Sequence, residues 1–258
     1  MQRILRILQS TGLLCADEMP VPRATFDDID ADAALMYFLS SRRRGVPLDL
    51  TPEAMPRLMR SLNLAAGEPL VPNLAGVMLF GRSPQTFKPV FVVKAFAFTG
   101  ETMNSSYMDR QEIGGTIAEQ YEHSLAFIYR NLHHVPSGPS FNSQDVLEIP
   151  QAVFEELLVN ALVHRDYFIN APIRLFIFSD RVEIISPGCL PNNLTAEQIR
   201  FGVSNIRNST LCSHAFHILP YSGIGNGIPR AAAAWPSLEF TDEREINQFR
   251  AVARRRSA

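Results

Sequence analysis

Apolar residues recur at three- and four-residue intervals along several stretches of the chain, which is the spacing typical of amphipathic helices. The clearest stretch is 150–164, where Val153 and Leu157 share one side with apolar residues of the following turns. Thr51 and Pro52 supply an N-cap and a first helical residue for another stretch. The helices predicted in this way cover residues 1–12, 30–44, 51–64, 73–80, 109–132, 150–164, 195–201 and 229–234.

Short segments rich in Val, Ile and Phe predict strands, and Ser179-Asp180 between two of them predicts a hairpin turn. The predicted strands cover residues 89–99, 171–178, 181–186, 238–240 and 247–253. Three stretches show neither period and predict irregular chain, namely 16–30, 135–145 and 202–227. Helices and strands in this order predict an α+β fold.

The order of elements divides the chain into three units. Residues 1–45 form a helical connector, and residues 46–108 form a small α/β middle unit with a winged-helix-like succession of elements. Residues 109–258 form a C-terminal α/β domain. With 258 residues, 46% of them hydrophobic and 19% charged, the chain is long and apolar enough to bury a sizeable core.

Charge and cysteine content narrow the class of protein. The net charge of -2 argues against a chain that binds nucleic acid by electrostatics alone. The three cysteines are odd in number and lack metal-ligand spacing, so we expect reduced thiols and a cytoplasmic protein. No apolar run reaches membrane-spanning length, so we expect no membrane contact.

Glu156 and Asn160 lie four residues apart on the predicted helix 150–164, and His164 continues the same stripe. An asparagine within an apolar helix competes for backbone hydrogen bonds, and a carboxylate one turn away gives a reason to tolerate it. Its carbonyl oxygen suits Mg²⁺, and the carboxylate suits the activation of a water. From spacing alone, a solvated polar stripe on a half-buried helix remains the favoured interpretation.

A glycine-rich segment precedes the predicted helix 229–234. Gly223, Gly225 and Gly227 alternate with other residues, which lets the backbone approach a ligand closely. The helix that Pro229 opens offers free N–H groups to an anion, and Arg230 adds a positive charge. Such a turn also occurs in plain loops, and it is no Walker A loop because no Gly-Lys-Ser/Thr follows.

Taken together, these motifs resemble a known family. Glu156-Leu-Leu-Val-Asn160 resembles the N-box of GHKL (HATPase-type) ATPases, and its continuation Ala-Leu-Val-His-Arg-Asp-Tyr167 resembles one branch of them. That branch comprises RecG-like ATP-dependent DNA helicase C-terminal domains, also described as transcriptional regulators with an AlbA-like Schlafen DNA-binding domain. The stretches that match it in order are Leu74 to Gly81, Asp109-Arg110, Asp180 to Gly188, Arg207-Asn208 and Leu219 to Arg230.

The resemblance implies a Bergerat (GHKL) α/β sandwich with a mixed sheet, preceded by the small helical unit, and Mg²⁺-ATP as cofactor. Glu156 would be the water-polarising base and Asn160 the Mg²⁺ ligand. The other nucleotide-binding residues that we infer are His164, Ser186, Gly188, Gly223, Gly225, Gly227 and Arg230. Weak Mg²⁺-dependent ATPase activity and a regulatory role follow as expectations.

The partners implied by the resemblance are a nucleotide, DNA through a missing or separate domain, and a second copy of the chain. The connector 1–45 resembles the last part of an AlbA-like domain. A helicase motor is not expected, because the chain has no P-loop. The alternative is a non-catalytic DNA-associated or dimerisation module whose nucleotide site has decayed.

Two positions depart from the GHKL pattern. These proteins usually recognise adenine with an aspartate in an Asp-x-Gly turn, and here Ser186-Pro187-Gly188 takes that place. A serine hydroxyl accepts a hydrogen bond from an amine less strongly than a carboxylate does. Cys189 stands where the branch favours a second glycine.

Overall fold

The computed structural model describes residues 8–9, 12–40, 51–136, 145–220 and 225–255. Its central element is a six-stranded sheet with the strand order β4-β3-β7-β8-β10-β9. The strands are β3 (Val93–Phe98), β4 (Tyr107–Ile113), β7 (Ile173–Ile177), β8 (Arg181–Pro187), β9 (Leu238–Glu243) and β10 (Gln248–Arg254). β3 and β7 pair in parallel, whereas the other neighbours are antiparallel, so the sheet is mixed as predicted.

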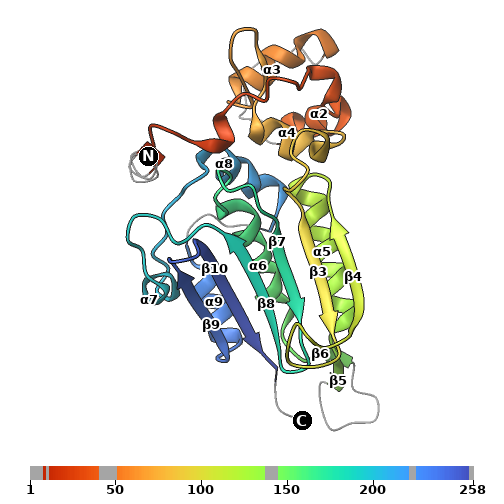
Figure 1. Cartoon of the computed structure of the whole chain (residues 1–258). Coiled ribbons are helices and arrows are strands. Elements are labelled where there is room, and N and C mark those ends of the chain that lie inside the picture. The colour runs from red at the N-terminus through yellow and green to blue at the C-terminus, as the bar shows by residue number, and fades with distance from the viewer. Residues whose placement is uncertain (1–7, 10–11, 41–50, 137–144, 221–224, 256–258) are drawn as a thin grey trace.

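Helices cover one face of this sheet (Figure 1). The covering helices are α5 (Ile117–Asn131), α6 (Gln151–His164) and α9 (Gly227–Ala234), and α7 (Ala196–Arg200) lies beside α9. Strand residues alternate between the two faces, and Val182 and Ile184 of β8 join the main core with the apolar residues of α6. The predicted α/β sandwich is therefore confirmed.

A small unit built mainly of helices lies at one end of the sheet (Figure 1). It contains α2 (Ala31–Ser40), α3 (Met55–Ser61), α4 (Leu74–Phe80), the strands β1 (Ala65–Ala66) and β2 (Val71–Pro72), and the 3-10 turns η1 (Ala16–Glu18), η2 (Phe26–Asp28), η3 (Pro52–Ala54) and η4 (Pro84–Thr86). The helices predicted over 30–44, 51–64 and 73–80 are found here, whereas most of the one predicted over 1–12 lies outside the described residues.

The sheet extends across the predicted limit between the middle unit and the C-terminal domain. β3 lies before residue 109, yet it pairs with β7 on one side and with β4 on the other. The strand predicted over 89–99 thus contributes to the same sheet as the predicted hairpin.

The helix predicted over 109–132 is wrong in its first part. Residues Tyr107–Ile113 form β4, an edge strand whose exposure alternates, and α5 begins only at Ile117. The helix starts there because Thr116 and Glu119 form a capping box, in which the Glu119 carboxylate accepts from the Thr116 N–H at 2.7 Å. The Gly114-Gly115 pair before that box was the available signal for the break.

Two predicted irregular stretches also contain regular structure. α8 (Ser209–Ile218) forms within 202–227, where its apolar residues Leu211 and Ala215 are buried. β5 (His134–Pro136) pairs with β6 (Asp145–Leu147) at the limits of the predicted linker. No helix in the described ranges is both long and apolar enough to cross a lipid bilayer.

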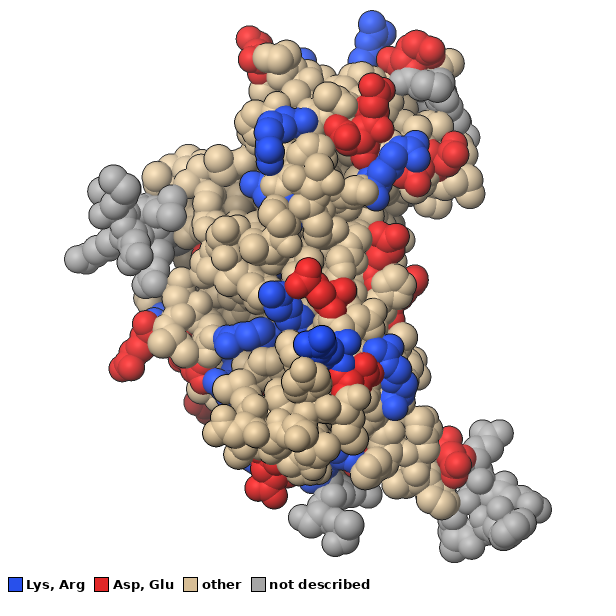
Figure 2. All heavy atoms as spheres, turned by 45° about the vertical axis from the view of Figure 1, so that its right-hand side comes forward, with Lys and Arg blue, Asp and Glu red and all other residues tan. Residues whose placement is uncertain are grey.

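The sheet face opposite the helices carries aromatic and charged side chains. Phe98, Phe176, Phe178 and Ile185 form a second, smaller buried cluster there. Toward β10 and β9 the same face becomes charged, and Figure 2 shows basic and acidic atoms interspersed on the side of the molecule that it presents. Mixed charges of this kind create no large field of one sign.

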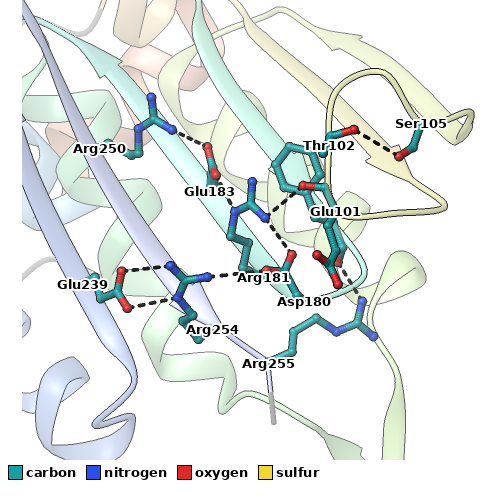
Figure 3. Close-up of polar contacts among 11 residues, drawn as sticks. Glu101, Thr102, Ser105, Asp180, Arg181, Glu183, Glu239, Arg250, Arg254 and Arg255 are labelled. Atoms are coloured by element: carbon teal, nitrogen blue, oxygen red, sulfur yellow. Dashed lines mark hydrogen bonds and ion pairs between the residues drawn. The ribbon is translucent and has the colours of Figure 1, made fainter. Parts of the chain in front are cut away.

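Glu183 is the centre of the charged network on this face (Figure 3). Its carboxylate accepts from Arg181 Nε at 2.6 Å and from Arg250 Nη1 at 3.0 Å, and its side chain is only 6% exposed. Arg181 also lies over the ring of Phe178, which joins the network to the aromatic cluster. Because charged side chains occupy this half of the face, it can contact water and needs no covering layer of helices.

We predict that Glu183→Ala lowers the free energy of unfolding by about 3 kcal/mol, because two partly buried guanidinium groups lose their shared partner. Glu239→Ala is the matched control, since Glu239 pairs with Arg254 but is 53% exposed. The control should cost about 1 kcal/mol or less. Urea denaturation measures both, and equal losses for the two variants would contradict the assignment of Glu183 as the centre of the network.

Candidate functional site

A pocket of about 960 Å³, including space open to solvent, lies between α6, the end of β8 and the start of α9. The predicted site residues that line it are Glu156, Asn160, His164, Ser186, Gly188, Gly225 and Gly227. Arg230 is exposed on α9 and is not part of the lining, and Gly223 lies outside the described residues.

Glu156 and Asn160 are in direct contact on α6. Asn160 Nδ2 donates to Glu156 Oε1 at 2.5 Å and to the Glu156 backbone oxygen at 2.7 Å. Both bonds use the amide nitrogen, and no hydrogen bond among the described residues uses the carbonyl oxygen of Asn160, which leaves this oxygen for a ligand or a cation. Burial raises the pKa of the Glu156 carboxyl, whereas the bond from Asn160 and the charge of Arg230 act in the opposite direction.

Gly227 brings the start of α9 directly against this pair. A Cβ atom at position 227 would lie 1.9 Å from the Cδ atom of Glu156, which is far inside van der Waals contact. Only a glycine therefore lets the Glu156 carboxylate take its observed position. Gly225, two residues earlier, lines the same side of the pocket.

Ser186 and Gly188 line the pocket at the end of β8. The Ser186 hydroxyl is buried and donates its hydrogen to the Ala161 backbone oxygen at 3.2 Å. With its hydrogen committed in this way, the oxygen can only accept from a ligand. Gly188 has a φ of 100°, and a Cβ there would lie 2.6 Å from Cβ of Asp166, so the turn also requires a glycine.

His164 ends α6 and lies at the Gly188 side of the pocket. Burial, together with the positive charge of Arg207, lowers the pKa of His164 to about 4. The imidazole is therefore neutral near pH 7, and it would contact a ligand by hydrogen bonding or packing rather than as a cation. Because Glu156 and His164 are eight residues apart on one helix, the pocket runs roughly 12 Å along α6.

Arg207 lines the pocket but was not among the predicted site residues. It appeared in the sequence only as part of the Arg207-Asn208 stretch that resembles the family. Its guanidinium donates to the His164 backbone oxygen at 3.2 Å and to the Cys189 backbone oxygen at 2.7 Å. It therefore joins the end of α6 to the turn that follows β8. The only available signal was the Arg207-Asn208 dipeptide in an apparently irregular stretch.

Apolar side chains from elements far apart in the sequence form much of the remaining lining, and no local pattern predicted their meeting. They include Leu157, Ile184, Leu190, Leu194, Ile199, Val203, Ile228 and Phe249. The pocket thus suits an elongated ligand with an apolar part and a polar part. Among the described residues there is no cluster of three or more His, Cys, Asp or Glu side chains that could hold a metal by itself.

Comparison with solved structures supports the fold. The chain is similar to the crystal structure of the DIP2311 protein from Corynebacterium diphtheriae, with a TM-score of 0.68 and 19% sequence identity. The match covers 90% of this chain and 46% of the corynebacterial chain, so this chain spans about half the length of that protein. No curated protein matches the chain.

One family model matches a segment in the C-terminal half of the chain. Residues 170–250 match the family described as "Putative ATP-dependent DNA helicase recG C-terminal". The matched range contains Ser186, Gly188, Gly225 and Gly227, whereas α6 precedes it. Over residues 170–250 the chain therefore matches the family that its motifs predict, an ATPase-like domain related to the RecG C-terminus.

Proposed function

We propose that this protein binds Mg²⁺-ATP in the pocket along α6 and uses the bound nucleotide to regulate a partner. The observation that carries the proposal is the contact between Glu156 and Asn160, closed by Gly227 at the start of α9. The desolvated Glu156 carboxylate is a water-activating group, and the Asn160 carbonyl oxygen, which no described residue bonds, is an adjacent ligand for a hard cation.

The base of the nucleotide is assigned to the Ser186–Gly188 side of the pocket. The Ser186 oxygen can accept a hydrogen bond from an exocyclic amine, because its own hydrogen is held by the Ala161 carbonyl. Gly188 and apolar side chains line this side of the pocket, which suits the ring of a base. Adenine carries such an amine, whereas hypoxanthine carries an oxygen at the same position.

The phosphates are assigned to the Glu156 side. Mg²⁺ usually binds through one or two protein oxygens together with phosphate oxygens and waters, so Asn160 Oδ1 and the nucleotide would suffice. The backbone N–H groups at the start of α9 would face the phosphates, and the exposed Arg230 is close enough to influence Glu156 electrostatically. Glu156 would accept a proton from the attacking water, with slow turnover.

The regulatory part of the proposal assigns DNA contact to a separate domain. The net charge of -2 and the mixed charges in Figure 2 provide no continuous basic surface on the face shown there. The proposal divides the chain into a connector (1–45), a middle unit (46–108) and an ATP-binding domain (109–258). The middle unit contributes β3 to the sheet that it shares with the ATP-binding domain. A second copy of the chain remains a candidate partner.

Nucleotide binding is tested by thermal unfolding with and without Mg²⁺-ATP. At a ligand concentration of about 100 times Kd, binding adds about 2.7 kcal/mol and raises Tm by roughly 5–10 °C. Asn160→Ala should remove most of this shift, because the cation loses its protein oxygen. An unchanged Tm of the wild type at millimolar Mg²⁺-ATP would refute the proposal and favour a non-catalytic module with a decayed site.

Base catalysis is tested with Glu156→Gln and Gly227→Ala. Glu156→Gln keeps an oxygen for Asn160 but removes the base, so hydrolysis should fall by about 100-fold or more while binding persists. Gly227→Ala should have a similar effect, because the flexible carboxylate must move away from the new methyl group. Phosphate release and ATP titration separate the two quantities, and hydrolysis that survives Glu156→Gln would remove Glu156 from this role.

Base recognition is tested by comparing ATP with ITP. The wild type should prefer ATP by about 10-fold, and Ser186→Ala should reduce the preference because the acceptor for the amine is lost. Ser213→Ala is the matched control, since Ser213 lies on α8 and its hydroxyl bonds the Thr210 backbone oxygen. Equal affinities of the wild type for both nucleotides would contradict the role assigned to Ser186.

A further inference from the structure

Two carboxylates bond the first turn of α8. They belong to the described residues 8–9 and 12–28, which we call the N-terminal segment. Asp17 is fully buried, and its Oδ2 atom accepts from the Leu211 N–H at 2.9 Å. Glu18 Oε1 accepts from the hydroxyls of Ser209 at 3.1 Å and Thr210 at 3.0 Å. Carboxylates suit this place, because the first N–H groups of a helix lack partners within the helix and its dipole is positive there.

The residue immediately before α8 holds the end of α6. Asn208 is fully buried, and its Nδ2 atom donates to the backbone oxygens of Val163 at 2.8 Å and Arg165 at 2.9 Å. Its neighbour Arg207 bonds the end of α6 and the turn after β8, as described above. Five consecutive residues, 207–211, therefore contact the pocket wall at one end and the N-terminal segment at the other.

Further contacts tie α8 to the small helical unit. Tyr37 Oη and His214 Nδ1 lie 2.5 Å apart, and His214 Nε2 lies 3.0 Å from the Leu62 backbone oxygen. Gln9 Nε2 also donates to Asp166 Oδ1 at 3.3 Å, so the N-terminal segment reaches the loop after α6 directly. Displacing the N-terminal segment would therefore disturb α8 and the pocket together.

We propose that Asp17 and Glu18 are positioning residues for the pocket, acting through α8 and the Arg207-Asn208 pair. Their contacts fix the start of α8, which in turn fixes the end of α6 and the turn at residues 187–189. The consequence for nucleotide affinity rests on the function proposed above, whereas the mechanical coupling does not. The N-terminal segment would then adjust the base side of the pocket.

The environment of Asp17 indicates that its contact is releasable rather than maximally stable. Its Oδ1 atom has no hydrogen-bond partner among the described residues. Burial raises the pKa of Asp17 to about 6, and the nearby Glu18 charge acts in the same direction. A buried carboxylate with one unpaired oxygen contributes less stability than a fully hydrogen-bonded one, so this contact is weaker than its burial alone would indicate.

The coupling is tested by hydrogen exchange of the whole chain carrying Asp17→Ala. The amides of 163–166, of Gly188 and Cys189, and of 209–212 should exchange about 10-fold faster than in the wild type, which corresponds to about 1.4 kcal/mol of local stability. Asp17→Asn should stay close to the wild type, because its carbonyl oxygen still accepts from Leu211. Asn208→Ala is the positive control and should accelerate 163–166 directly.

Asp28→Ala is the matched negative control. Its carboxylate also caps a turn of the N-terminal segment, accepting from the Thr25 N–H at 2.8 Å, but it has no contact with α8 among the described interactions. Acceleration confined to 209–212 in Asp17→Ala would overturn the proposal, and so would equal acceleration at 163–166 in Asp28→Ala. If Asp17→Ala unfolds the helical unit, Glu18→Ala must give the same pattern with smaller amplitude.

Nucleotide affinity provides the second measurement. Titration with Mg²⁺-ATP should show about 10-fold weaker binding for Asp17→Ala and unchanged binding for Asp28→Ala and Asp17→Asn. A wild type that binds no ATP would refute the proposed function, and the exchange data would then decide the coupling alone. A wild type that binds ATP with an affinity insensitive to Asp17→Ala would refute the coupling to the pocket.

Discussion

The burial of α6 against the sheet, in one layer with α5 and α9, is the constraint on which the candidate site depends. The helix is apolar on most of its surface, and its buried residues include Val153, Phe154, Leu158 and Leu162. Polar groups in such a helix must find partners nearby, because an unpaired buried polar group is costly. Asn160 meets this requirement by donating to Glu156. Both bonds use its amide nitrogen, so they leave its carbonyl oxygen for a ligand or a cation.

Close backbone approach determines the two sides of the pocket. Gly227 lets α9 begin against the Glu156 carboxylate, and Gly188 lets the turn after β8 approach Asp166 and Arg207. A Cβ at position 227 would displace the Glu156 carboxylate, and a Cβ at position 188 would clash with Cβ of Asp166. The positions of these two glycines therefore matter more for the site than the flexibility of the segments that contain them.

The family match and the structural match support different statements about the molecule. The family match over 170–250 contains the glycines and Ser186, whereas Glu156 and Asn160 precede it. The structural similarity at 19% identity establishes the fold alone. A hydrogen bond connects the family-matched segment to α6, because the Ser186 hydroxyl donates to the backbone oxygen of Ala161, one residue beyond Asn160. The carboxylate-amide pair and the matched segment therefore form one pocket.

Elements with a strong local periodic pattern were predictable from the amino-acid sequence alone. α6, α7 and the β7–β8 hairpin were predicted close to their observed limits, and Glu156 and Asn160 were correctly placed on one helical face. Tertiary structure decided β4, since an edge strand with alternating exposure and a helix share apolar positions over a short segment. It also decided α8, which is fixed by Asp17 and Glu18 from nearly 200 residues earlier. Local periodicity carries no information about such distant partners, so only the folded chain shows that Asp17 and Glu18 contact the start of α8, directly after the pocket residue Arg207.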